Sequence, residues 1–121
     1  MNTLNIQTVK DAQSLIRERK LDYVKVGIFD IDGIFRGKYM KASKFLHVLE
    51  KGFQFCDVVV GWDSNDQLYE DAGVTITGWH SGYSDAQVNI VPQSCRELPL
   101  EKNTLLFIGE FGDKYEQVCP R

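Results

Sequence analysis

The chain has 121 residues, 43% of them hydrophobic and 26% charged, with a formal net charge of −3. This length and composition predict one globular domain spanning residues 1–121. The acidic balance and scattered basic residues argue against binding to nucleic acid or anionic membranes, and no apolar run is long enough to span a bilayer. The N-terminus lacks the pattern of a signal peptide, so we expect a cytoplasmic protein.

The three cysteines, Cys56, Cys95 and Cys119, are widely spaced and form no Cys-x-x-Cys motif. With only two histidines in the chain, the usual zinc-ligand spacings are absent. Reduced thiols in a reducing compartment are the simplest interpretation, with a lone reactive cysteine as the alternative.

The first predicted elements are a helix and a β-hairpin. Thr8 and Asp11 resemble a capping box, and the apolar residues that follow have helical spacing, which predicts an amphipathic helix over residues 8–20. Strands are predicted over 23–30 and 34–40, joined by a type I′ turn in which Asp32 and Gly33 both have positive φ. In the second strand we expect Phe35 and Tyr39 to point inward and the basic residues to face solvent, namely Arg36, Lys38 and Lys41.

A second helix is predicted from Ser43, as its cap, to Lys51, with Gly52 as a left-handed stop. We then predict a strand over 53–60 and a long loop over 61–85. A short strand over 86–91, ended by Pro92, a turn-rich segment over 93–103 and a strand over 104–111 complete the predicted order. A hairpin requires antiparallel pairing, so we predict an α+β fold: a β-grasp-like mixed sheet with a β-hairpin and one or two packed helices.

The segment Ile28-Phe-Asp-Ile-Asp-Gly33 has two interpretations. It is similar to the first motif of haloacid-dehalogenase phosphatases, which would make Asp30 the nucleophile and Asp32 the general acid/base, both next to magnesium. Against this, a second strand follows at once where that family has a helical crossover, and Ile34 lacks the usual hydroxyl. The alternative is turn chemistry, because short carboxylates bind backbone amides in hairpin loops.

The order of motifs along the whole chain resembles the N-terminal domain of the glutamine synthetase family. The variant Arg36-Gly37-Lys38 is closer to the branch of γ-glutamyl-polyamine synthetases. The resemblance rests on the hairpin 26–40, the helix with Gly52-Phe53, the loop Val60-Gly-Trp-Asp-Ser64, Gly82-Tyr-Ser-Asp-Ala86, Leu98-Pro-Leu100, the strand 104–110 and the terminal Cys119-Pro-Arg121.

This resemblance implies a β-grasp domain whose loop completes the active site of a neighbouring subunit's catalytic domain in a ring-shaped homo-oligomer. Asp63 matches the family's ammonium-binding residue, which assists deprotonation of ammonia or an amine before attack on a γ-glutamyl phosphate. Ser64 and Asp85 match supporting positions. The loop departs from the usual pattern at Trp62 and Asn65, which leaves the amine substrate open.

The family's catalytic domain, with its ATP and Mg²⁺ or Mn²⁺ sites, has no counterpart in this sequence, so the resemblance implies no cofactor or metal site here. We therefore expect the 121-residue chain by itself to be inactive and to act with the catalytic domains of its own and a neighbouring subunit. Two other classes stay open: a non-catalytic interaction module of the same fold, and the phosphatase that uses Asp30 and Asp32.

Overall fold

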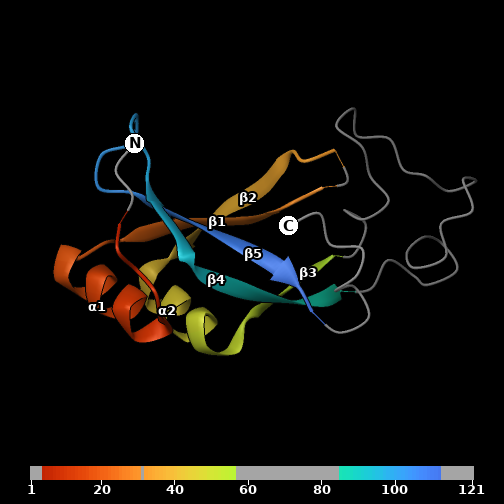
Figure 1. The fold of residues 1–121 in the computed structure, drawn as a ribbon, viewed down its shortest axis with the longest axis horizontal. Helices are drawn as coiled ribbons and strands as arrows, with labels where there is room; N and C mark the ends of the chain where they lie inside the picture. Colours follow the sequence, from red (N-terminus) through yellow and green to blue (C-terminus); the bar gives the residue numbers. More distant parts are fainter. Residues whose placement is uncertain (1–3, 31, 57–84, 113–121) are drawn as a thin grey trace, which may run out of the picture.

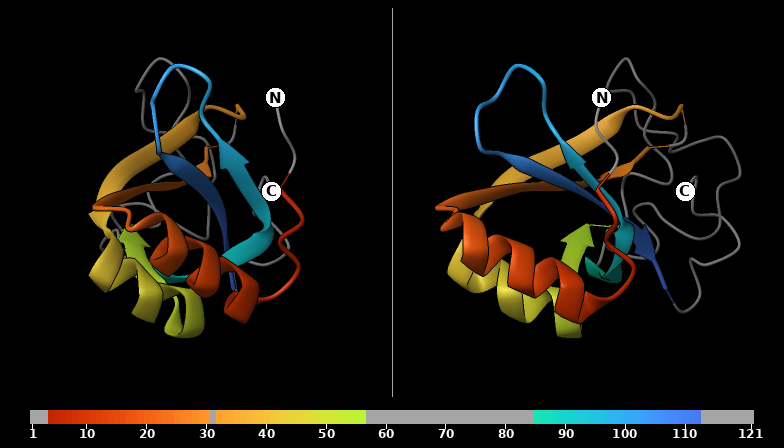
Figure 2. Two further views of the ribbon diagram at one scale, coloured as in Figure 1. Left: turned by 90° about the vertical axis from the view of Figure 1, so that its left-hand side faces the viewer. Right: turned by 60° about the vertical axis from the view of Figure 1, so that its left-hand side comes forward.

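The computed structural model describes residues 4–30, 32–56 and 85–112. These residues form a mixed five-stranded sheet in the order β2-β1-β5-β4-β3, with two helices packed on the same side of it (Figures 1 and 2). The predicted α+β fold with a β-grasp-like mixed sheet is confirmed. Its elements are α1 (Val9–Arg19), β1 (Tyr23–Phe29), β2 (Phe35–Lys41), α2 (Ala42–Lys51), β3 (Phe53–Cys56), β4 (Asp85–Glu97) and β5 (Leu105–Phe111).

Helix α1 begins with the predicted capping box. The Thr8 hydroxyl accepts a hydrogen bond from the Asp11 amide at 3.2 Å, and the Asp11 carboxylate accepts one from the Thr8 amide at 3.1 Å. Hydrogen bonds from the backbone amides of Gln7 and Thr8 hold the pKa of Asp11 below its ordinary value. The cap fixes the start of the helix, and the buried side chains of Ala12 and Ile16 attach it to the core.

Strands β1 and β2 form the predicted antiparallel hairpin, but the predicted type I′ turn is wrong. Among the described residues of this loop only Gly33 has positive φ, at 79°. The hairpin closes instead through hydrogen bonds from the Asp30 amide to the Ile34 carbonyl and from the Gly33 amide to the Asp30 carbonyl, both at 3.0 Å. The wider loop is stabilised by the Asp30 carboxylate, which binds the amides of Asp32 and Ile34.

Helix α2 follows β2 directly, so the prediction that Ser43 caps it is wrong. Its N-cap residue is Lys41, whose side chain makes no capping hydrogen bond, and Ser43 lies within the first turn. The Ala42 amide instead donates to the Asp22 carbonyl at 2.9 Å. At the other end Gly52 has the predicted positive φ of 74°, although its ψ of −171° lies outside the left-handed helical region.

Strand β4 is longer than predicted, because it continues through Pro92 to Glu97. Its pairing with β5 is interrupted between Val91 and Arg96 by a register shift. Proline has no amide hydrogen to donate, and this irregular stretch does not require one. The Ser94 hydroxyl replaces a backbone group here: it accepts from the Ile108 amide at 2.8 Å and donates to the Val91 carbonyl at 2.5 Å.

The core lies between the concave face of the sheet and the helices. Val24, Val26 and Ile28 of β1 point into it, as predicted from their alternation. The rings of Phe45 in α2 and Phe107 in β5 pack together at a tilt of 47°, with their centroids 4.8 Å apart. In β2 the expectation that Tyr39 points inward is wrong: the buried residue is its neighbour Met40, and Tyr39 is 53% exposed.

Candidate functional site

Strand directions bring several chain segments to one end of the sheet. β1 is parallel to β5, β4 is antiparallel to β5, and β3 is antiparallel to β4. The last residues of β1, β3 and β5 and the first residues of β2 and β4 therefore share one end, on the right in Figure 1. We call it the hairpin-loop end and define it by the Asp30–Ile34 loop, Cys56, Asp85 and Gly112.

Residues 57–84 connect β3 to β4 at the hairpin-loop end. Cys56 and Asp85 are backbone partners in the antiparallel ladder, so this segment leaves and rejoins the sheet at adjacent positions. The predicted site residues Asp63 and Ser64 lie outside the described residues. Asp85 is the first residue of β4, but its side chain is not among the parts that the structure describes. The structure thus defines where the segment is attached and leaves the predicted site residues themselves untested.

The Asp30 side chain at the hairpin-loop end accepts three hydrogen bonds. It is fully buried, and one carboxylate oxygen accepts hydrogen bonds from the amides of Asp32 and Ile34, both at 2.9 Å. The other oxygen accepts from Arg36 Nε at 2.9 Å. The prediction that Arg36 simply faces solvent is therefore wrong, because Arg36 forms this ion pair with Asp30 across the hairpin.

These contacts explain the charge state of Asp30. Burial by itself would raise the pKa of the carboxyl group, since a charged group loses its hydration. The hydrogen bonds from Ile34, Arg36 and Asp32, together with the positive charge of Arg36, outweigh burial and hold the pKa below its ordinary value of 3.8. Asp30 is therefore ionised and serves as the organising anion of the loop.

The same geometry decides between the two interpretations of the Asp-x-Asp motif. A phosphatase nucleophile must be open to substrate, whereas Asp30 is fully buried with both oxygens engaged by the hairpin. The chain also turns directly into β2 rather than into a crossover helix. The arrangement supports the turn interpretation of Asp30.

A glutamine network at the same end was not evident from the sequence. Gln87 Nε2 donates to the Lys51 carbonyl at 2.7 Å, and Gln87 Oε1 accepts from Gln54 Nε2 at 3.0 Å. A Cβ atom on Gly52 would lie 2.4 Å from the backbone oxygen of Val88, so glycine is required here beside Gln87. Because Gln87 joins the C-terminus of α2 to β3 and β4, it fixes the elements next to residues 57–84. Scattered glutamines carry no sequence signal for this network, which depends on strand register.

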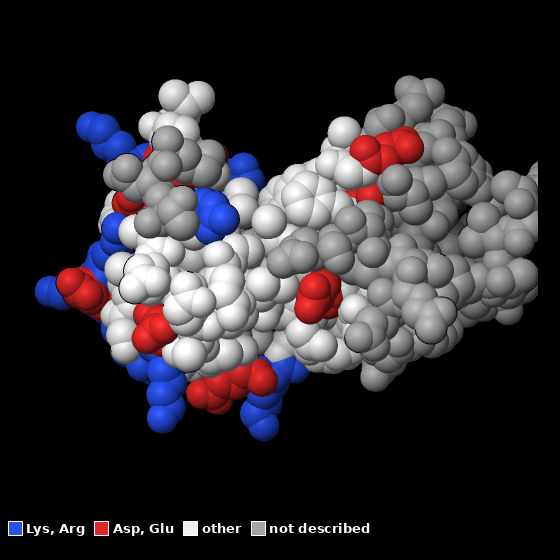
Figure 3. All heavy atoms as spheres, in the orientation of Figure 1, with Lys and Arg blue, Asp and Glu red and all other residues white. Residues whose placement is uncertain are grey.

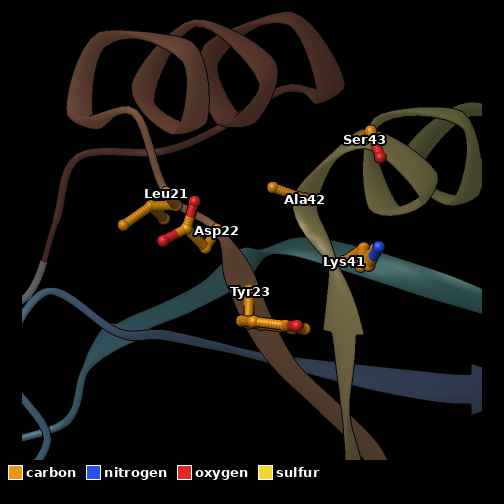
Figure 4. Close-up of a pocket in the computed structure, with 6 residues that line it drawn as sticks. All are labelled: Leu21, Asp22, Tyr23, Lys41, Ala42 and Ser43. Carbon is orange, nitrogen blue, oxygen red and sulfur yellow. The ribbon is translucent and has the colours of Figure 1, made fainter.

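The opposite end of the sheet carries a pocket of about 470 Å³, lined by Leu21, Asp22, Tyr23, Lys41, Ala42 and Ser43 (Figure 4). Its polar side chains come from the start of β1 and from the β2–α2 junction, and they do not converge on one point in the close-up. Asp22, Lys41 and Ser43 are all exposed. The pocket therefore lacks the buried, convergent polar groups that mark a specific ligand site.

Other chemistry is sparse in the described part of the chain. Burial raises the pKa of the Cys95 thiol to about 11, so this cysteine is not a nucleophile at neutral pH. Among the described residues, no three His, Cys, Asp or Glu side chains gather to hold a metal ion. None of the described helices has the length and apolarity needed to span a membrane. On the face shown in Figure 3, charged side chains lie around the helices and at the upper left of the view, and the middle of the described surface is largely uncharged.

Comparison with known proteins identifies the class. No protein-family model matches the chain. It is 41% identical over 109 residues, or 88% of its length, to type-1 glutamine synthetase 2 of Dictyostelium discoideum, covering 20% of that protein. It is 35% identical over 86 residues, or 70% of its length, to glutamate–isopropylamine ligase of a Pseudomonas species, covering 18% of it. The chain thus spans about a fifth of the length of the curated relatives it matches.

Solved structures share the fold. A cryo-electron microscopy structure of Plasmodium falciparum glutamine synthetase matches 96% of this chain with a TM-score of 0.60 and 18% identity, over 20% of that chain. The GmaS/ADP complex matches 85% of this chain with a TM-score of 0.59 and 16% identity, also over 20% of that chain.

The strand order and the packed helices define an α+β domain with a β-grasp-like sheet. Together with the two relatives above 30% identity, they show that the chain belongs to the glutamine synthetase family, as its N-terminal domain. The family resemblance in the sequence is confirmed.

Proposed function

We propose that this chain is the N-terminal domain of an ATP-dependent ligase that joins ammonia or an amine to the γ-carboxylate of glutamate. The observation that carries the proposal is 41% identity over 88% of the chain to a glutamine synthetase. The second relative is named for ligation of glutamate to isopropylamine, and a third, 26% identical over 105 residues, is a γ-glutamylethanolamide synthetase of Streptomyces coelicolor. All three names are those of a synthetase or ligase whose substrate or product is glutamate, glutamine or a γ-glutamyl amide.

Within this proposal the domain works next to a catalytic domain, in a ring-shaped homo-oligomer, and completes the active site of a neighbouring subunit. ATP and Mg²⁺ or Mn²⁺ bind in the catalytic domain rather than in this chain. The attachment of residues 57–84 at the paired positions Cys56 and Asp85 supports this arrangement, because both ends of the segment are tied to the sheet.

We assign Asp63 to the amine. A carboxylate attracts a cationic ammonium group and accepts its proton once the nucleophile is near its target. Ser64 and Asp85 support the loop in this scheme. Replacing Asp63 by Asn should therefore impair the amine-dependent step and leave the binding of glutamate and ATP largely unchanged.

A chimera tests the ligase proposal. The matching region of the Dictyostelium glutamine synthetase is replaced by this chain, and formation of the γ-glutamyl amide is measured with ammonia and with small alkylamines. We expect a soluble chimera that forms product at a rate within about tenfold of the parent's. A folded chimera that assembles normally and makes no amide would contradict the proposal.

A non-catalytic interaction module of the same fold is the second candidate. Sequencing the gene beyond the Arg121 codon distinguishes the two. A following domain with metal-binding glutamates supports the ligase, and a following domain without them supports the interaction module.

A further inference from the structure

Lys38 connects the two edges of the sheet. β2 and β3 are the edge strands, separated in the hydrogen-bonded order by three others. Lys38 of β2 nevertheless places its ammonium nitrogen 5.2 Å from the ring centroid of Phe53 and 5.9 Å from that of Phe55, both in β3. The sheet is therefore curled enough for a single side chain to cross its concave face.

The register explains why Lys38 reaches these rings. It lies two residues from the buried Met40 and pairs with the buried Val26 of β1, so its side chain starts on the concave face. Phe53 is 9% exposed, and its ring meets that of Phe55 edge-on, with centroids 6.2 Å apart and planes at 80°. The two rings thus form one aromatic surface next to the ammonium group.

We infer that Lys38 is a positioning residue: its ammonium group holds edge strand β3 against the hairpin and so fixes the point from which residues 57–84 leave the sheet. The described part of β3 covers four residues, and among the described residues it pairs with β4 alone. An edge strand frays more easily than a central one, and the Lys38 contact restrains the side of β3 that does not pair with β4. The effect of this restraint on catalysis rests on the proposed ligase function.

The restraint itself is measurable without any activity, by amide hydrogen exchange in the 121-residue chain. Lys38→Met keeps the length of the side chain and removes its charge, and Lys38→Arg keeps the charge. Lys41→Met is the matched control, because Lys41 is in the same strand and is exposed. We expect exchange at the amides of residues 53–56 to be about two- to fivefold faster in Lys38→Met, as expected for loss of an exposed cation–π contact, and near wild type in the other two variants.

The same variants in the chimera test the catalytic consequence. Lys38→Met should raise KM for the amine about two- to fivefold with kcat and KM for ATP nearly unchanged, and Lys38→Arg should restore it. Unchanged exchange in β3 would overturn the inference. Faster exchange with an unchanged amine KM would restrict Lys38 to a structural role and overturn its positioning role. An inactive chimera would contradict the ligase proposal, while hydrogen exchange would still decide whether Lys38 restrains β3.

Discussion

The two ends of the sheet differ in the burial and hydrogen bonding of their polar side chains. At the hairpin-loop end the carboxylate of Asp30 is fully buried and accepts three hydrogen bonds. At the opposite end Asp22, Lys41 and Ser43 line a pocket while remaining exposed. The pocket thus lacks the buried, hydrogen-bonded polar groups that the hairpin-loop end has. The hairpin-loop end is also where residues 57–84 are attached.

The largest expected loss of stability comes from removing the negative charge of Asp30. Asp30→Asn removes the negative charge that Arg36 contacts and weakens the hydrogen bonds to the amides of Asp32 and Ile34, so we expect a loss of about 2–4 kcal/mol in the free energy of unfolding. Urea denaturation followed by circular dichroism measures it. Asp22→Asn, at the opposite end, should cost less than about 0.5 kcal/mol. Equal losses in the two variants would remove the contrast between the ends.

The contribution of Asp30 should depend on pH. Its pKa is lower in the folded chain than the ordinary value of 3.8, so the unfolded chain takes up the proton first as pH falls. The stabilisation is complete above that ordinary pKa and is lost as pH falls through the folded value. The difference in unfolding free energy between wild type and Asp30→Asn should therefore be constant near pH 7 and shrink below about pH 4. A difference that grows on acidification would contradict the assigned ion pair.

A smaller effect is expected at the β4 irregularity, which lies towards the opposite end. Ser94 is 7% exposed and provides the hydrogen-bond partner of the Ile108 amide. Ser94→Ala should cost about 1–2 kcal/mol, because the part-buried amide of Ile108 loses the hydroxyl that accepts its hydrogen bond. Thermal unfolding compares it with Ser43→Ala, an exposed serine of the pocket, for which we expect almost no change. This pair shows whether burial, rather than location, decides the outcome.

The smallest effect concerns the exposed contact between Tyr39 and Glu101, in the half of the hairpin away from its loop. The Tyr39 hydroxyl donates to Glu101 at 2.7 Å, and Lys25 Nζ lies 5.3 Å from the Tyr39 ring centroid. Tyr39→Phe removes only the hydroxyl contact and should change the free energy of unfolding by no more than about 0.5 kcal/mol. Urea denaturation of Tyr39→Phe and Asp30→Asn under the same conditions compares their losses in unfolding free energy. A loss in Tyr39→Phe close to that in Asp30→Asn would contradict the expected small effect.

Much of the fold could be predicted because local rules and burial agree. The capping box of α1, the alternation in β1 and the apolar run of β5 each gave the correct element, since each pattern matches the face that is buried. Predictions failed where a tertiary contact replaced a local one. The Asp30 carboxylate changed the expected turn, and the Ser94 hydroxyl accompanies a strand that passes through Pro92.

The candidate site could be predicted only in part. The family resemblance follows from motif order, and the comparisons confirm it. The contact of Lys38 with Phe53 and the contact of Gln87 with Lys51 depend on sheet curl and strand register, which no local pattern encodes. The assignment of Asp63 stays a prediction, because that residue lies outside the described part of the chain.

The most direct test of the proposed role is the amine dependence of the chimera with Asp63→Asn beside the matched variant Asp22→Asn. We predict that Asp63→Asn lowers kcat/KM for the amine by about 100-fold or more, as expected when a group that accepts the amine proton is removed, while KM for ATP stays within about twofold. Asp22→Asn should leave both unchanged. Wild-type amine kinetics in a folded Asp63→Asn chimera would contradict the assignment of the amine-binding role to residues 57–84.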